Sequence, residues 1–228
     1  MRILFVVLRS AGAVAILAAI VGQLITTSAF WDSRGITDHT ILFVNFFSFF
    51  TIDSNVLAVV VLAVGAVVLL RGGVEPRLFG TVRAAVTAYM AVTGIVYNLL
   101  LRGVNVSEGL VLPWSNEVLH VVGPLLVVGD WLFAPGRAPL DWRRIRVILA
   151  FPIVWAAYTL LRGPFAPDPL AGATTWYPYP FLNPALAPTG YASVALYVLL
   201  IAAIIGLAGA GVIWVSRRPA RPVVPSTP

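Results

Sequence analysis

One short segment inside a long apolar stretch carries several polar side chains that could do chemistry. The segment contains Ser48, Thr51, Asp53, Ser54 and Asn55. At about 100° per residue, all of these except Asp53 lie on one face of a helix. The simple explanation for any one of them is a hydrogen bond to a neighbouring helix or to a carbonyl one turn earlier. Four on one face favour a polar strip in which Thr51 offers a hydroxyl nucleophile.

A second polar segment supplies an imidazole. Asn116 and Glu117 precede His120 by four and three residues, so all three can lie on one side of a helix. Pro124 lacks an amide hydrogen and predicts a kink that frees the carbonyl of His120. A hydroxyl and an imidazole are the groups needed for nucleophilic catalysis, in which the ring takes the proton of the attacking alcohol. The alternative for a lone histidine is a hydrogen-bonded packing role.

The composition indicates that these groups belong to a membrane protein. Of 228 residues, 60% are hydrophobic and 11% are charged, whereas soluble proteins carry about 25% charged residues. The net charge of +6 comes from 15 arginines without any lysine. Because these arginines are scattered singly, they favour a membrane surface over nucleic acid as the partner. The lack of cysteine excludes disulfides, thiol nucleophiles and cysteine-ligated metal sites.

Six apolar stretches are long enough to cross about 30 Å of hydrocarbon as helices. They cover residues 10–30, 41–70, 79–101, 110–133, 145–161 and 190–215. Helices are expected because a bilayer offers no partner to an unpaired peptide group. The sequence therefore predicts an all-α integral membrane bundle over residues 1–218. Residues 219–228, which are rich in proline and have no apolar period, are predicted to be a disordered cytoplasmic tail.

The arginines also predict the orientation of the bundle. Twelve of them lie on one side if both termini and the 2–3 and 4–5 loops are cytoplasmic, and three lie on the other. An alternative is that residues 1–29 are a cleaved signal peptide, but the apolar run is longer than a usual signal core. The bias to Ala, Val and Arg is typical of a GC-rich bacterial genome. The expected location is therefore the bacterial cytoplasmic (inner) membrane.

The two polar segments are predicted to lie at the same depth. With a cytoplasmic N-terminus, the second and fourth spans both run from outside to inside. Thr51 is ten residues past residue 41, and His120 is ten residues past residue 110. Each therefore lies about 15 Å from the outer end of its span. We expect the hydroxyl and the imidazole to meet in a cavity open to the outer leaflet.

Three patches of this sequence carry a resemblance to a known family. They are Phe50-Thr51-Ile52, Trp114-x-Asn116-x-x-x-His120-x-x-x-Pro124 and Tyr179-Pro180-Phe181-Leu182. With the six-span topology, they resemble the androgen-induced-protein family of six-pass membrane proteins. Animal members hydrolyse fatty-acid esters of hydroxy fatty acids through a membrane-embedded Thr and His. The resemblance implies that Thr51 is the nucleophile and His120 the general base. The chain departs from the family pattern at Ser54-Asn55 and at Glu117, which concerns the substrate more than the fold.

The expected reaction needs more groups than these two. A third group would orient the imidazole, and the candidates are Asp53, Asn116 and Glu117. Candidate donors to the oxyanion are Ser54, Asn55 and Asn116. No cofactor is expected, and no metal site, because a metal needs three or four converging ligands. The expected partners are membrane lipids and a lipid ester, not nucleic acid.

The connection between the fifth and sixth spans, residues 162–188, is rich in proline and aromatic residues. Trp176, Tyr179 and Phe181 are candidates for a lid over an outward-facing site. Their alternative role is to anchor the loop at the membrane interface. The whole polar strip also has an alternative, as the binding site of a non-catalytic lipid-binding protein or small-solute carrier. Carriers often have broken helices in matching positions of two halves, whereas proline interrupts only the fourth and fifth spans here.

Overall fold

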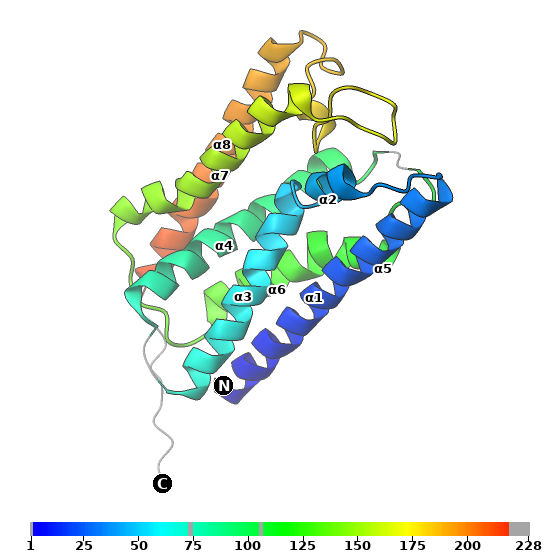
Figure 1. Ribbon diagram of the computed structural model, residues 1–228. Helices are drawn as coiled ribbons and strands as arrows, with labels where there is room; N and C mark the ends of the chain where they lie inside the picture. The colour runs from blue at the N-terminus through cyan, green and yellow to red at the C-terminus, as the bar shows by residue number, and fades with distance from the viewer. Residues whose placement is uncertain (1, 73–74, 105–106, 219–228) are drawn as a thin grey trace.

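The computed structural model describes residues 2–72, 75–104 and 107–218. Within these ranges the chain is a helical bundle without a β-strand, and six helices are long and apolar enough to cross a membrane (Figure 1). The predicted all-α membrane bundle is thus confirmed. The spans are Arg2–Ser33, Phe50–Leu70, Arg77–Leu101, Pro113–Phe133, Trp142–Phe165 and Tyr191–Ser216. The predicted disordered tail, residues 219–228, lies outside the described residues.

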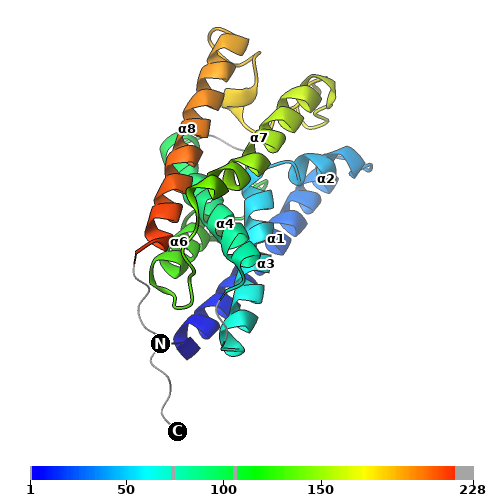
Figure 2. The same ribbon diagram turned by 90° about the vertical axis from the view of Figure 1, so that its left-hand side faces the viewer.

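Helix α4 is the centre of the bundle and contacts α3, α6, α7 and α8, while α1 packs along α3 (Figure 2). Small buried residues such as Ala84, Ala85 and Ala88 let these neighbours approach α4 closely. The α-helices are α1 (Arg2–Ser33), α2 (Thr40–Phe46), α3 (Phe50–Leu70), α4 (Arg77–Val96), α5 (Pro113–Glu117), α6 (Gly123–Phe133), α7 (Ile145–Arg162) and α8 (Tyr191–Ser216).

The second predicted span is broken in the structure. The sequence predicted one helix over residues 41–70, but α2 ends at Phe46 and α3 begins at Phe50, after an extended residue at Phe49. Helix α7 supplies partners at the break: the indole of Trp155 donates to the carbonyl of Ser48 at 3.1 Å, and the hydroxyl of Tyr158 lies 3.0 Å from that of Ser48. Such partners make irregular backbone tolerable at membrane depth. Ser48 is therefore not on the same helical strip as Thr51.

Two spans contain π-helical turns. Such turns are rare in proteins overall, but those that occur are often found at functional sites. The turn Val118–Val122 joins α5 to α6, and the turn Tyr97–Leu101 follows α4. The irregularity predicted at Pro124 thus lies in the turn before it. Helix α4 passes very close here, since a Cβ atom at Gly94 would lie 3.2 Å from Cβ of Pro124 and 3.4 Å from the carbonyl oxygen of His120. Glycine at position 94 permits this approach.

A cluster of buried ion pairs ties the helices together near the N-terminal end of α1. Asp130 accepts from Arg9 at 2.7 Å and from Arg83 at 2.8 Å, and Glu75 accepts from Arg83 at 2.6 Å. Arg9 also donates to the carbonyl of Gly65 at 2.7 Å. No charged side chain of the cluster is more than 7% exposed. Asp130 on α6 has its arginine partners on α1 and α4, because α6 packs against these two helices.

Candidate active site

The hydroxyl of Thr51 and the imidazole of His120 lie within hydrogen-bonding distance, although they belong to different spans. Oγ1 of Thr51 is 3.3 Å from Nε2 of His120, and Nδ1 of the same ring is 2.9 Å from the carbonyl oxygen of Asn116. A carbonyl oxygen can only accept, so Nδ1 carries the proton and Nε2 is left to accept from Thr51. This is the arrangement of a nucleophile and its general base. The distance is slightly long, as is common before a substrate tightens such a contact.

Thr51 lies in the first turn of α3, directly after the break. The first N–H groups of a helix have no partner within it, and together they carry a partial positive charge. The N–H of Thr51 donates to the hydroxyl of Tyr179 at 3.2 Å. The break therefore places the Thr51 hydroxyl at the positive end of a helix, which favours negative charge that develops nearby.

Ser54 and Asn55 both hydrogen-bond to the backbone carbonyl of Thr51. Asn55 donates to the carbonyl of Thr51 at 2.8 Å and to that of Leu119 at 3.1 Å, so it links α3 to the π-helical turn. The Ser54 hydroxyl donates to the Thr51 carbonyl at 3.1 Å and lies 3.0 Å from that of Thr93. Both side chains are fully buried. Their hydrogen atoms are used inside the protein, which makes them positioning groups here, whereas the sequence offered them as oxyanion donors.

Within the described residues, neither carboxylate offered as an orienting group hydrogen-bonds to the imidazole. Glu117 pairs with Arg102 at 3.0 Å, and 48% of its side chain is exposed. Asp53 is partly buried, and its carboxylate makes no hydrogen bond within the described ranges. The backbone carbonyl of Asn116 orients the imidazole instead. The amide side chain of Asn116 donates to the hydroxyl of Tyr97, whose ring stacks on His120 with centroids 4.0 Å apart. Sequence reasoning missed Tyr97, because an aromatic residue in an apolar span carries no distinguishing signal.

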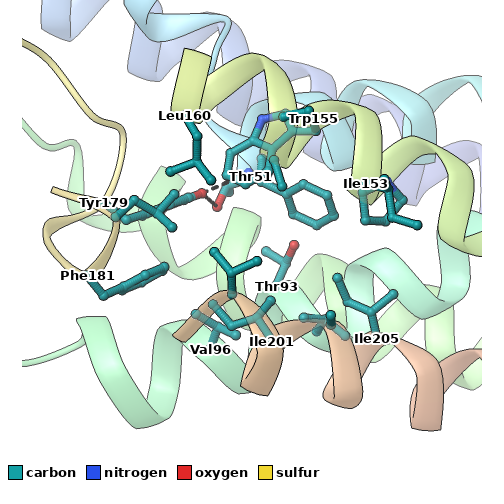
Figure 3. A pocket seen from close by; sticks show the side chains of 18 of the residues that line it. Thr51, Thr93, Val96, Ile153, Trp155, Leu160, Tyr179, Phe181, Ile201 and Ile205 are labelled. Atoms are coloured by element: carbon teal, nitrogen blue, oxygen red, sulfur yellow. Dashed lines mark hydrogen bonds between the residues drawn. The ribbon is translucent and has the colours of Figure 1, made fainter. Parts of the chain in front are cut away.

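Thr51 faces an apolar cavity of about 400 Å³ between α4, α7 and α8 (Figure 3). This volume is in the range of small-molecule sites. Polar groups reach it only from Thr51, Thr93, Tyr97, Trp155 and Tyr179 among its lining residues. Apolar lining residues include Val96, Ile153, Leu160, Phe181, Ile201 and Ile205. The cavity therefore suits an apolar chain whose polar end lies near Thr51.

His120 lines a different hollow. A groove of about 460 Å³ runs over Gly94, Asn98, His120 and Pro124, on a face that Thr51 does not reach. The sequence predicted that both groups would line one shared cavity. In the structure Thr51 lines the cavity and His120 the groove, and the two side chains meet between them. His120 does not line the cavity because the ring of Tyr97, which stacks on the imidazole, lines it in its place.

The loop between α7 and α8 covers the cavity near Thr51. The hydroxyl of Tyr179 lies 3.3 Å from Oγ1 of Thr51, and the ring of Phe181 stacks on that of Tyr179 at 5.2 Å (Figure 3). Trp176 is not among the residues that line the cavity; it packs edge-on against Phe49 at 5.5 Å and under the guanidinium of Arg162. Of the three aromatic lid candidates, Tyr179 and Phe181 line the cavity, whereas Trp176 holds the loop in place.

Comparison with protein families, with curated proteins and with solved structures finds no match to this chain. In the part of the chain that the structure describes, no three His, Asp or Glu side chains come together as a metal site would require.

Proposed function

We propose that this protein is an intramembrane hydrolase of lipid esters, with Thr51 as nucleophile and His120 as general base. The observation that carries the proposal is the 3.3 Å contact between Oγ1 of Thr51 and the accepting Nε2 of His120, at the wall of an apolar cavity. The resemblance to the androgen-induced-protein family suggests the same two residues and the fatty-acid ester class. The positive end of α3 adds a reason why the hydroxyl at position 51 suits this chemistry.

The reaction proceeds in two halves. Oγ1 of Thr51 bonds to the ester carbonyl carbon, its proton passes to Nε2 of His120, and the carbonyl π pair moves onto the carbonyl oxygen. Collapse of this intermediate breaks the bond to the alcohol oxygen, which takes the proton from Nε2. Water then attacks the acyl group on Thr51 and gives one proton to His120. Release of the fatty acid returns this proton to Thr51.

The lining of the cavity favours the acyl chain as the part of the substrate that the protein binds. Its walls come from α4, α7 and α8 and are almost wholly apolar, so they gain from burying methylene groups and offer nothing to a charged solute. This is also why a small-solute carrier is the less favoured alternative. A cofactor has no step to perform in this mechanism, and the partners we propose are membrane lipids and a lipid ester.

We place the protein in the bacterial cytoplasmic membrane as a multi-pass protein with both termini in the cytoplasm. The support is the bias of arginines to one set of loops. This orientation puts Thr51 and His120 in the half of the bundle nearer the outer leaflet. Cysteine-accessibility labelling of single-cysteine variants in whole cells checks it, and the lack of native cysteines makes the labelling clean.

Purified protein in detergent, offered a fluorogenic medium-chain ester and a fluorophosphonate probe, tests the function. Wild type is expected to hydrolyse the ester and take up the probe, and Thr51→Val to do neither. Thr87→Val is the matched control, because the Thr87 hydroxyl is buried in α4 and, within the described residues, bonds only to the Arg83 carbonyl at 2.8 Å. Labelling and turnover that survive in Thr51→Val would overturn the assignment. Tight lipid binding by wild type without turnover of any ester would favour a non-catalytic lipid-binding protein.

A further inference from the structure

We propose that Tyr179 is a catalytic residue, whose hydroxyl donates a hydrogen bond to the oxyanion formed during ester cleavage. The inference rests on the proposed function and extends it to a residue in the loop between α7 and α8. The sequence offered Tyr179 as part of a lid or of an interfacial anchor. Among the described residues, Tyr179 is the one side chain besides His120 that lies within hydrogen-bonding distance of the Thr51 hydroxyl, at 3.3 Å.

The hydrogen-bond directions around Thr51 are fixed from both ends. At one end, the carbonyl of Asn116 makes Nδ1 of His120 the donor, so Nε2 accepts the proton of Thr51. At the other end, the N–H of Thr51 donates to the hydroxyl oxygen of Tyr179 at 3.2 Å. With its own proton committed to His120, Oγ1 of Thr51 can only accept from Tyr179. The free proton of Tyr179 is therefore directed at the reacting oxygen.

The Tyr179 hydroxyl keeps its proton in this environment. Burial raises the pKa of Tyr179 to about 12, so the phenol is neutral and available as a donor at physiological pH. The bond from the N–H of Thr51 withdraws electron density from the phenol oxygen, and neighbouring hydrogen bonds strengthen one another. The hydroxyl proton of Tyr179 thus extends the partial positive charge at the start of α3 further toward the cavity.

The ring of Tyr179 is held before any substrate arrives. Phe181 stacks on it with planes only 7° apart, and Phe49 and Trp155 pack against it at 5.7 Å and 6.1 Å. A donor that is already oriented costs no reorganisation when charge develops, which is the main advantage of an oxyanion site. The apolar lining of the cavity also offers few hydrogen-bond partners to water that would compete for the same bond.

The donated bond changes partner as the reaction proceeds. When Oγ1 of Thr51 bonds to the carbonyl carbon, it loses its proton to His120 and gives up a lone pair. The carbonyl oxygen gains the π pair and becomes the strongest acceptor in the cavity. The hydroxyl of Tyr179 turns from Oγ1 to this oxygen and keeps its own proton throughout. When the bond to the alcohol breaks, the carbonyl re-forms and Tyr179 returns to Thr51.

Tyr179→Phe tests this role, with Tyr177→Phe as the matched control in the same loop. Loss of one oxyanion donor is expected to lower kcat by roughly 10²–10³-fold and to leave KM nearly unchanged. An alkyl trifluoromethyl ketone forms a tetrahedral adduct with an active-site alcohol. Its affinity should fall in parallel with kcat/KM in Tyr179→Phe and stay at the wild-type level in Tyr177→Phe.

Other outcomes separate this inference from the proposed function. A rise in KM with kcat and ketone affinity unchanged would show that Tyr179 is only a lid and would overturn the inference. Failure of wild type to turn over any ester would remove the proposed function itself. Should Tyr179→Phe prove unstable in thermal unfolding, 3-fluorotyrosine at position 179 retains the ring and gives a more acidic donor. A change in kcat at constant KM then supports the inference, and an unchanged kcat contradicts it.

Discussion

Tyr97 and His120 each lie in a π-helical turn, and their rings stack with centroids 4.0 Å and planes 23° apart. Each π-helical turn shifts the helical register that follows it, so paired turns can bring two rings face to face where regular helices would not. Asn116 joins the two, since its side chain donates to Tyr97 and its carbonyl accepts from His120. The imidazole is thus oriented through its Nδ1 and over its face.

Replacement of Tyr97 should show how much the stacked ring contributes, as distinct from the contact of its hydroxyl with Asn116. Tyr97→Leu removes the stacked ring, and we expect kcat to fall by about 10–100-fold, because small misplacement of a base is costly. Tyr97→Phe keeps the ring and loses only the contact with Asn116, so its loss of kcat should be several times smaller. The measurement is kcat on a fluorogenic ester with thermal unfolding as the control for folding. Equal losses in both variants would contradict the stacking argument.

Bulk added to the cavity should change substrate preference. Ala202 on α8 lines the cavity, and Ala202→Phe would fill part of it. We expect kcat/KM for a dodecanoyl ester to fall by roughly tenfold or more, since lost methylene burial costs about 0.8 kcal/mol per group, while kcat/KM for an acetyl ester changes little. The ratio of the two values is the measurement. A uniform loss with both esters would indicate that the acyl chain binds elsewhere.

Removal of the Glu117 carboxylate should have little effect. Its partner is Arg102 at 3.0 Å, both side chains are nearly half exposed, and such pairs contribute about 0–1 kcal/mol. We expect Glu117→Gln to retain activity within about threefold of wild type, which corresponds to less than 1 kcal/mol. A steady-state assay at neutral pH checks this. A hundredfold loss of activity would indicate that Glu117, and not the carbonyl of Asn116, orients the imidazole.

The buried ion pairs should be sensitive to the loss of one member. Asp130→Asn leaves Arg9 and Arg83 in a site at most 2% exposed for their side chains, with Glu75 as the remaining carboxylate. Breaking a buried pair typically costs about 3–5 kcal/mol of unfolding free energy. Thermal or denaturant unfolding in detergent measures it. Arg102→Gln, which breaks an exposed pair, is the control and should cost less than about 1 kcal/mol.

The sequence predicted the six spans and the two polar segments, because both depend on apolar length and on polar residues within it. It did not predict the break before α3, since Phe46, Phe47, Phe49 and Phe50 continue the apolar run without a sign of irregular backbone. Residue 41, from which the predicted depth of Thr51 is counted, belongs to α2 and not to α3, yet Thr51 still meets His120. The ion-pair partners of Asp130 could not be predicted from the sequence either, because Asp130 meets Arg9 only through the packing of α6 against α1 and α4.

The break between α2 and α3 depends on α7, whose Trp155 and Tyr158 hold Ser48. The same helix forms one wall of the cavity next to Thr51. An outward displacement of α7 that widened this wall would also remove both contacts from Ser48 and loosen the first turn of α3. The width of the cavity and the position of the Thr51 hydroxyl are thus coupled through one helix.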